Sequence, residues 1–148
     1  MSETGTIVWV HGDCLSPHNP ALRQNAGAPA LFVWDEALLA QWQISLKRIV
    51  FMYECLLELP VTIRRGKVVE ELCAFAREHG ATRIVTTESV SPHFRDLRTQ
   101  LAKTHELAVL PVEPFVRYGG EFDLKRFARY WKVAEPLAYG AREQLNLW

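Results

Sequence analysis

Short apolar segments alternate with helix-forming segments between residues 6 and 112, and this alternation constrains the fold more than any other feature of the chain. The apolar segments are continuously apolar, as in strands that are covered on both faces of a parallel sheet. They lie at residues 6–10, 30–34, 61–63, 83–87 and 107–112. Helices are predicted between them, at residues 19–24, 43–59, 67–79 and 92–105. The pattern predicts an α/β fold, a Rossmann-like, doubly wound, five-stranded parallel sheet with helices on both faces.

Capping residues support the predicted helices. Asn19 precedes Pro20, and Ser91 precedes Pro92, which is the pattern of a cap residue followed by proline in the first turn. Gly80 is placed to end the helix at 67–79. In the helix at 43–59, apolar residues recur at helical spacing and are expected to share one inward face; they are Leu46, Ile49, Val50, Tyr53, Leu56 and Leu57.

Composition excludes several classes of function. The 17 Lys and Arg residues equal the 17 Asp and Glu residues in number and form no cluster, so direct DNA binding by general electrostatics is not expected. No apolar run approaches the roughly 20 residues of a membrane span, and the first residues do not resemble a signal peptide. Cys14, Cys55 and Cys73 lack the spacing of a zinc site and are predicted to be reduced thiols. We therefore expect a cytoplasmic protein.

The chain changes character after the last predicted strand. Residues 1–113 are predicted to form the α/β domain, and residues 114–148 a helical C-terminal extension packed on that domain or on a partner. Asp123 is expected to cap a helix over residues 124–132, with an apolar stripe formed by Leu124, Phe127, Ala128 and Trp131. The alternative is a surface for another protein or a second copy of the chain, made of Phe127, Tyr130, Trp131 and Trp148.

Polar residues follow the predicted strands and mark a candidate binding site. In an open parallel sheet, ligands bind outside the carboxyl ends of the strands, where the strand order reverses. The residues at those ends are His11, Asp13, Trp34, Asp35, Glu36, Thr87, Glu88 and Ser89. Their oxygens suit the hydroxyls of a ribose or ribityl chain, and Trp34 offers a surface on which an aromatic ring can stack.

Catalytic and metal-binding motifs are absent from the sequence. It contains no GxGxxG, no GxxxxGK[ST] and no GxSxG pattern, which argues against a dinucleotide enzyme, a nucleoside triphosphatase or a serine hydrolase. His11 and Asp13 are expected to share a local hydrogen bond rather than to act as an acid and base pair. Together with His18 they match no established metal-site spacing. We predict no catalytic residue and no metal site.

The opening of the chain resembles the photolyase and cryptochrome family. In that family a strand ending in Trp leads to Arg-x-Asp-Leu-Arg and then to Asp-Asn-Pro-Ala-Leu, which Trp9, Asp13 and residues 19–22 match. Residues 33–35, 47–51 and 88–96 resemble later family segments. The family arginines fall on His11 and Leu15, and its Asp before Asn falls on His18, so the salt bridges of those groups are not expected here.

The resemblance implies a function for the sheet domain. In the family this domain holds an antenna chromophore such as a folate, deazaflavin, flavin or lumazine, whereas the catalytic FAD lies in a helical domain that follows. Because the chain ends at Trp148, we expect only the antenna-type domain, which is not an enzyme by itself. Three functions stay open: a module that binds a flavin-like, folate-like or nucleotide-like chromophore, a ligand-free protein interaction subunit, and one part of a split photolyase.

Overall fold

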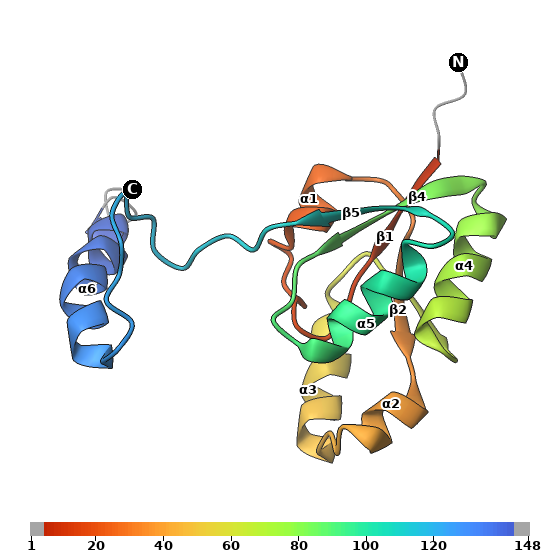
Figure 1. Ribbon diagram of the computed structural model, residues 1–148, viewed down its shortest axis with the longest axis horizontal. Helices are drawn as coiled ribbons and strands as arrows, with labels where there is room; N and C mark the ends of the chain where they lie inside the picture. Colours follow the sequence, from red (N-terminus) through yellow and green to blue (C-terminus); the bar gives the residue numbers. More distant parts are fainter. Residues whose placement is uncertain (1–4, 144–148) are drawn as a thin grey trace. The chain divides into compact units, whose positions relative to one another are not determined.

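The computed structural model describes residues 5–143 and contains a five-stranded parallel sheet in the order β3-β2-β1-β4-β5 (Figure 1). The strands are β1 (Gly5–Trp9), β2 (Ala30–Trp34), β3 (Thr62–Arg65), β4 (Ala81–Thr87) and β5 (Glu106–Leu110). The central strand β1 pairs with β2 on one side and with β4 on the other. Strand order therefore reverses between β1 and β4, which confirms the predicted doubly wound sheet and places a crevice at the carboxyl ends of these strands.

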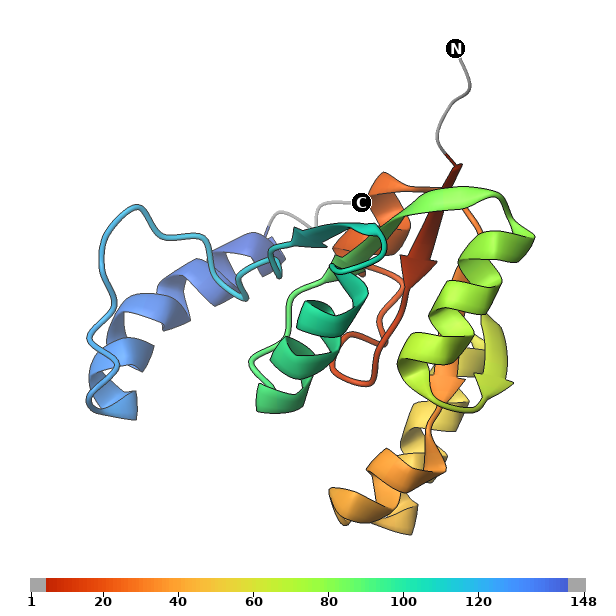
Figure 2. The same ribbon diagram turned by 45° about the vertical axis from the view of Figure 1, so that its right-hand side comes forward.

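Helices cover both faces of the sheet, as predicted. On one face, α4 (Val68–Glu78) and α5 (Pro92–Leu101) lie side by side (Figure 2). Their buried side chains join one core cluster with β-strand residues such as Ile7 and Ile84. On the other face, α1 (Pro20–Gln24) and α3 (Leu46–Leu57) pack around Val8 and Phe32. Because the central strands have a core on each side, both sets of their alternating side chains are apolar.

The predicted helix at residues 43–59 differs from the structure in two ways. Residues 36–41 form an additional short helix, α2 (Glu36–Gln41), which the prediction missed, and α3 begins only at Leu46. Moreover, α3 buries Met52 and Leu56, whereas most of the predicted inward face is exposed: Leu46, Val50, Tyr53 and Leu57. Apolar residues occupy about half of the helix circumference, so periodicity alone could not tell which part of it contacts the sheet.

Residues 113–148 form a second compact unit, distinct from residues 1–112. Its helix α6 (Phe127–Glu143) starts later and runs further than the predicted helix at 124–132. Asp123 does accept a hydrogen bond at the helix entrance, from the Lys125 N–H at 3.0 Å, but the residues up to 126 form turns. The helix continues through Pro136, which costs it one backbone hydrogen bond without ending it.

Candidate functional site

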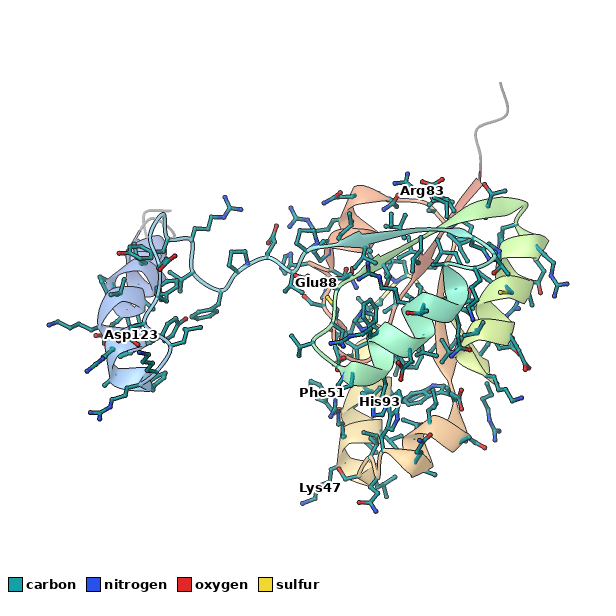
Figure 3. The ribbon with its side chains drawn as sticks, viewed as in Figure 1. Lys47, Phe51, Arg83, Glu88, His93 and Asp123 are labelled. Carbon is teal, nitrogen blue, oxygen red and sulfur yellow. The ribbon has the colours of Figure 1, made fainter. Side chains whose placement is uncertain are left out.

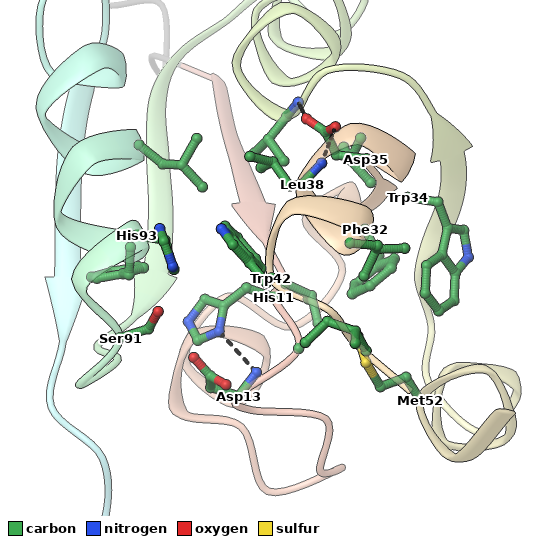
Figure 4. A pocket seen from close by; sticks show the side chains of 18 of the residues that line it. His11, Asp13, Phe32, Trp34, Asp35, Leu38, Trp42, Met52, Ser91 and His93 are labelled. Carbon is green, nitrogen blue, oxygen red and sulfur yellow. Dashed lines mark hydrogen bonds between the residues drawn. The ribbon is translucent and has the colours of Figure 1, made fainter. Parts of the chain in front are cut away.

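A cavity of about 330 Å³ opens at the carboxyl ends of β1 and β2, near the point where strand order reverses (Figure 4). Its walls come from the loop after β1, from β2, from α2 and the start of α3, and from the first turns of α5. Most lining side chains are aliphatic or aromatic. The polar ones are His11, Asp13, Asp35, Arg48, Ser91, His93 and the indole of Trp42.

Two groups of aromatic rings form the walls of this cavity. Trp9 stacks on Phe94 with their ring centroids 5.3 Å apart and an interplanar angle of 19°. Trp42, which follows α2, stacks on His93 of α5 with their ring centroids 4.3 Å apart and an interplanar angle of 22°. Flat rings at these positions present π-faces and edges, which favour a planar aromatic ligand over an aliphatic one.

His11 is held as a neutral imidazole beside these rings. Its Nε2 donates to the Thr87 carbonyl at 2.6 Å, and its Nδ1 accepts from the Asp13 backbone N–H at 3.3 Å. These two bonds fix the tautomer, because a carbonyl oxygen only accepts and a backbone N–H only donates. Burial lowers the pKa of His11 below its usual range, outweighing the hydrogen bond to Thr87 and the charge of Asp13, which raise it. His11 therefore contributes an aromatic ring to the cavity wall, and its two hydrogen bonds connect the loop after β1 with the end of β4.

The predicted local contact between His11 and Asp13 exists, but it uses the backbone of Asp13 rather than its carboxylate. One carboxylate oxygen instead lies 3.4 Å from the Arg48 guanidinium, and the other accepts from the Ser89 hydroxyl. The Asp13 carboxylate thus connects the loop after β1 with α3 and with the loop after β4. Arg48 is half exposed at this position, so it can also meet an anionic group of a ligand.

Asp35 lines the cavity, yet its carboxylate is occupied by the protein itself. Oδ1 accepts from the Leu38 N–H at 3.1 Å and caps α2, while Oδ2 accepts from the Val68 N–H at 3.3 Å at the start of α4. Trp34 also lines the cavity and packs edge-on against Phe32, with centroids 4.9 Å apart. A carboxylate at a helix N-terminus stabilises that helix, so Asp35 primarily positions the α2 wall.

The other residues predicted from the strand ends, namely Glu36, Thr87, Glu88 and Ser89, are not among those that line this cavity. Glu36 pairs with Arg65 at 2.5 Å on the surface, and Glu88 accepts from the Val112 N–H at 2.9 Å. Thr87 is fully buried and donates to the Asn19 Oδ1 at 2.7 Å. These contacts hold the loops around the cavity in place without reaching the cavity itself.

Trp42 and His93, like Arg48 and Ser91, line the cavity and were not predicted from the sequence. Trp42 follows the short helix that was not predicted, and His93 lies at the start of the helix predicted at residues 92–105, so nothing in the linear order linked them. The indole Nε1 of Trp42 is buried and has no hydrogen-bond partner among the residues that the structure describes. A buried donor of this kind is uncommon, and a ligand acceptor that met it would recover the lost interaction.

Replacing Trp42 with phenylalanine tests this assignment without any ligand. The substitution removes the unpartnered N–H and keeps a ring on His93, so we expect the free energy of unfolding to stay within about 0.5 kcal/mol of the wild type or to rise. Trp42→Ala also removes the ring stack and should cost at least about 1 kcal/mol more. Urea unfolding of both variants provides the measurement. A Trp42→Phe variant as unstable as Trp42→Ala would contradict an unpartnered indole.

The residues predicted for partner binding lie in the second unit. Phe127 and Trp131 stack with centroids 5.8 Å apart, Tyr130 contacts Phe127 with centroids 6.2 Å apart, and Phe127 is exposed. Trp148 lies outside the described residues.

Across residues 5–143, no helix has the length and apolarity of a membrane crossing, and no group of His, Cys, Asp and Glu side chains could hold a metal ion.

These features define an open, doubly wound α/β domain with a ligand-sized, aromatic-walled cavity beside its switch point. The family model for DNA photolyase matches residues 6–117. The chain therefore belongs to the DNA photolyase family, and the match covers the sheet domain, which confirms the resemblance seen in the opening motif.

A solved structure, a universal stress protein in complex with cAMP, also resembles the chain, with 17% sequence identity and a TM-score of 0.40. That alignment covers 76% of this chain and 98% of the other. Among the curated proteins, none matches at a significant level.

Proposed function

We propose that the sheet domain binds a planar heteroaromatic chromophore of the flavin, folate, deazaflavin or lumazine class in the cavity beside its switch point. The observation that carries this proposal is the pairing of aromatic walls with a buried indole N–H at Trp42 that has no partner within residues 5–143. Such chromophores combine a flat π-system with ring carbonyls and ring nitrogens, which are the acceptors that this donor lacks. The cavity of about 330 Å³ lies at the lower end of the ~300–1,000 Å³ range of small-molecule sites.

The remaining polar groups fit the rest of such a ligand. Arg48, half exposed, is positioned to pair with a phosphate or carboxylate on the ligand's tail. Ser91 can hydrogen-bond a ribityl or ribose hydroxyl, because its own hydroxyl makes no capping bond to α5. Asp35, Thr87 and His11 already use their polar atoms within the protein, so the chromophore is held mainly by stacking and by few hydrogen bonds.

Titration with riboflavin, FMN, a folate and a lumazine tests this proposal. We expect at least one of them to bind with a Kd of about 10 µM or tighter, with quenched flavin fluorescence or a shifted absorption band as the signal. Trp42→Phe should weaken that ligand about five- to tenfold, because it removes one hydrogen-bond donor. Absence of binding to all four at about 1 mM would contradict the proposal.

A matched pair of substitutions locates the ligand. Ser91→Tyr places a bulky ring in the cavity and should abolish binding, whereas Val90→Tyr adds the same ring at a fully exposed neighbouring position and should leave the Kd unchanged. Unfolding curves for both variants check that each is folded. Equal loss of affinity in the two variants would indicate a site elsewhere.

A protein interaction role is the second candidate, and the second unit favours it. Leu124 and Phe127 are exposed at 77% and 72%, although both are large apolar residues in or beside α6. The adjacent Arg126 and Arg129 give this region a basic border. Exposed aromatic and aliphatic side chains bordered by arginine are typical of protein interfaces.

A further inference from the structure

Helix α3 carries an apolar stripe that the sheet does not cover. Leu46, Val50, Tyr53 and Leu57 are exposed at 75%, 47%, 49% and 64%. They follow one another at intervals of four, three and four residues, so they lie in one line along the helix. Exposed single apolar residues are common on protein surfaces, but a continuous line of four marks a contact surface. Figure 3 shows the neighbouring Lys47 and Phe51 on the same helix.

The spacing of the stripe indicates that its partner is another helix. Intervals of four and three residues are those of the a and d positions in helix pairs, where side chains of one helix insert between those of the other. The 12 residues of α3 correspond to about 18 Å of helix, enough for three turns of contact. The stripe therefore fits one helix of similar length.

Charges beside the stripe identify which helix it fits. Lys47 and Glu54 are seven residues apart, so they flank the stripe on the same side, and neither forms an ion pair within residues 5–143. We propose that α3 pairs with α3 of a second copy of this chain in antiparallel orientation. About the two-fold axis, Val50 then packs against Tyr53 of the second copy, and Leu46 against its Leu57.

This arrangement also pairs the charges. Lys47 of each copy faces Glu54 of the other, so one symmetric contact contains two opposite-charge pairs. A parallel pair gives neither residue an opposite charge, because the corresponding flanking positions on the other side of the stripe, Ile49 and Leu56, are uncharged. The dimer is independent of the proposed chromophore, since none of Leu46, Val50, Tyr53 and Leu57 lines the cavity.

Sedimentation velocity of the full chain from about 1 µM to about 500 µM tests the dimer. We expect a concentration-dependent monomer–dimer equilibrium, and we expect Val50→Lys to raise the dissociation constant at least tenfold, because it places charge at the centre of the stripe (~1.4 kcal/mol per tenfold). Val90→Lys, at a fully exposed position outside α3, is the matched control and should leave the dissociation constant unchanged. A wild-type chain that stays monomeric throughout would overturn the proposal.

A charge exchange tests the antiparallel orientation. Lys47→Glu places a glutamate opposite Glu54 in both contacts of the dimer. The repulsion should raise the dissociation constant about threefold to tenfold. The double variant Lys47→Glu with Glu54→Lys restores opposite charges in both contacts, so its dissociation constant should return to near the wild-type value. A double variant that stays as weak as Lys47→Glu alone rules out the antiparallel pair. Circular dichroism of each variant verifies that α3 remains folded.

Discussion

Replacing Asn19 with alanine is expected to destabilise the sheet domain by about 3 kcal/mol, a large part of the ~5–15 kcal/mol that holds a domain of this size together. Asn19 is buried, and its side chain makes four hydrogen bonds. Its Oδ1 accepts from two backbone N–H groups of α1 and from the Thr87 hydroxyl, and its Nδ2 donates to the Cys14 carbonyl at 2.9 Å. Alanine would remove all four bonds, and of the two α1 N–H groups only that of Ala21 would keep another acceptor, the Thr87 hydroxyl at 3.3 Å.

Urea unfolding followed by circular dichroism measures this loss, and Thr87→Val is the companion variant. Valine removes the hydroxyl that donates to Asn19 and keeps the shape, so we expect a smaller cost, about 1–2 kcal/mol. Because both side chains belong to one network, the double variant should cost less than the sum of the two single variants. Strict additivity, or a loss below about 1 kcal/mol in Asn19→Ala, would show that the network does not hold the loop.

Stability of the sheet domain should fall as the pH drops below about 6.5, because of His11. In the folded protein, burial lowers the pKa of His11, whereas in the unfolded chain its pKa is near 6.5. The unfolded chain therefore binds a proton at a higher pH than the folded one. The contribution of His11 is complete above the unfolded pKa and is lost as the pH falls from there through the folded pKa, by at most about 1.4 kcal/mol per pH unit.

His11→Gln separates this effect from the titration of carboxylates. Glutamine can donate to the Thr87 carbonyl but carries no ionisable group, so the stability of this variant should change less between pH 7 and pH 5 than that of the wild type. Its stability at pH 7 is expected to be lower, because it loses the ring contact with Phe94, whose centroid lies 5.2 Å away. Parallel pH curves for the two proteins would contradict a partly buried, neutral His11.

The sequence by itself determined the architecture of the sheet domain. Continuous apolar runs at residues 6–10, 30–34 and 83–87 indicate strands that are buried on both faces, and these strands are β1, β2 and β4. Proline at the first helical position after Asn19 and after Ser91 marks the starts of α1 and α5. These signals are local, because each depends on the preference of a few neighbouring residues for one backbone conformation.

Only the tertiary structure decided which polar groups at the strand ends have their side-chain atoms taken up by the protein itself. Asp35 and Thr87 looked like ligand contacts in the sequence, yet the starts of α2 and α4 occupy Asp35, and Asn19 occupies Thr87. Conversely, Trp42 and His93 are 51 residues apart in the chain and meet at a centroid distance of 4.3 Å. The buried side of α3 was likewise decided by tertiary contacts, because packing against the sheet buries Met52 and Leu56 rather than the predicted face. Hydrogen-bond partners and buried faces depend on segments distant in sequence, and no local pattern encodes those contacts.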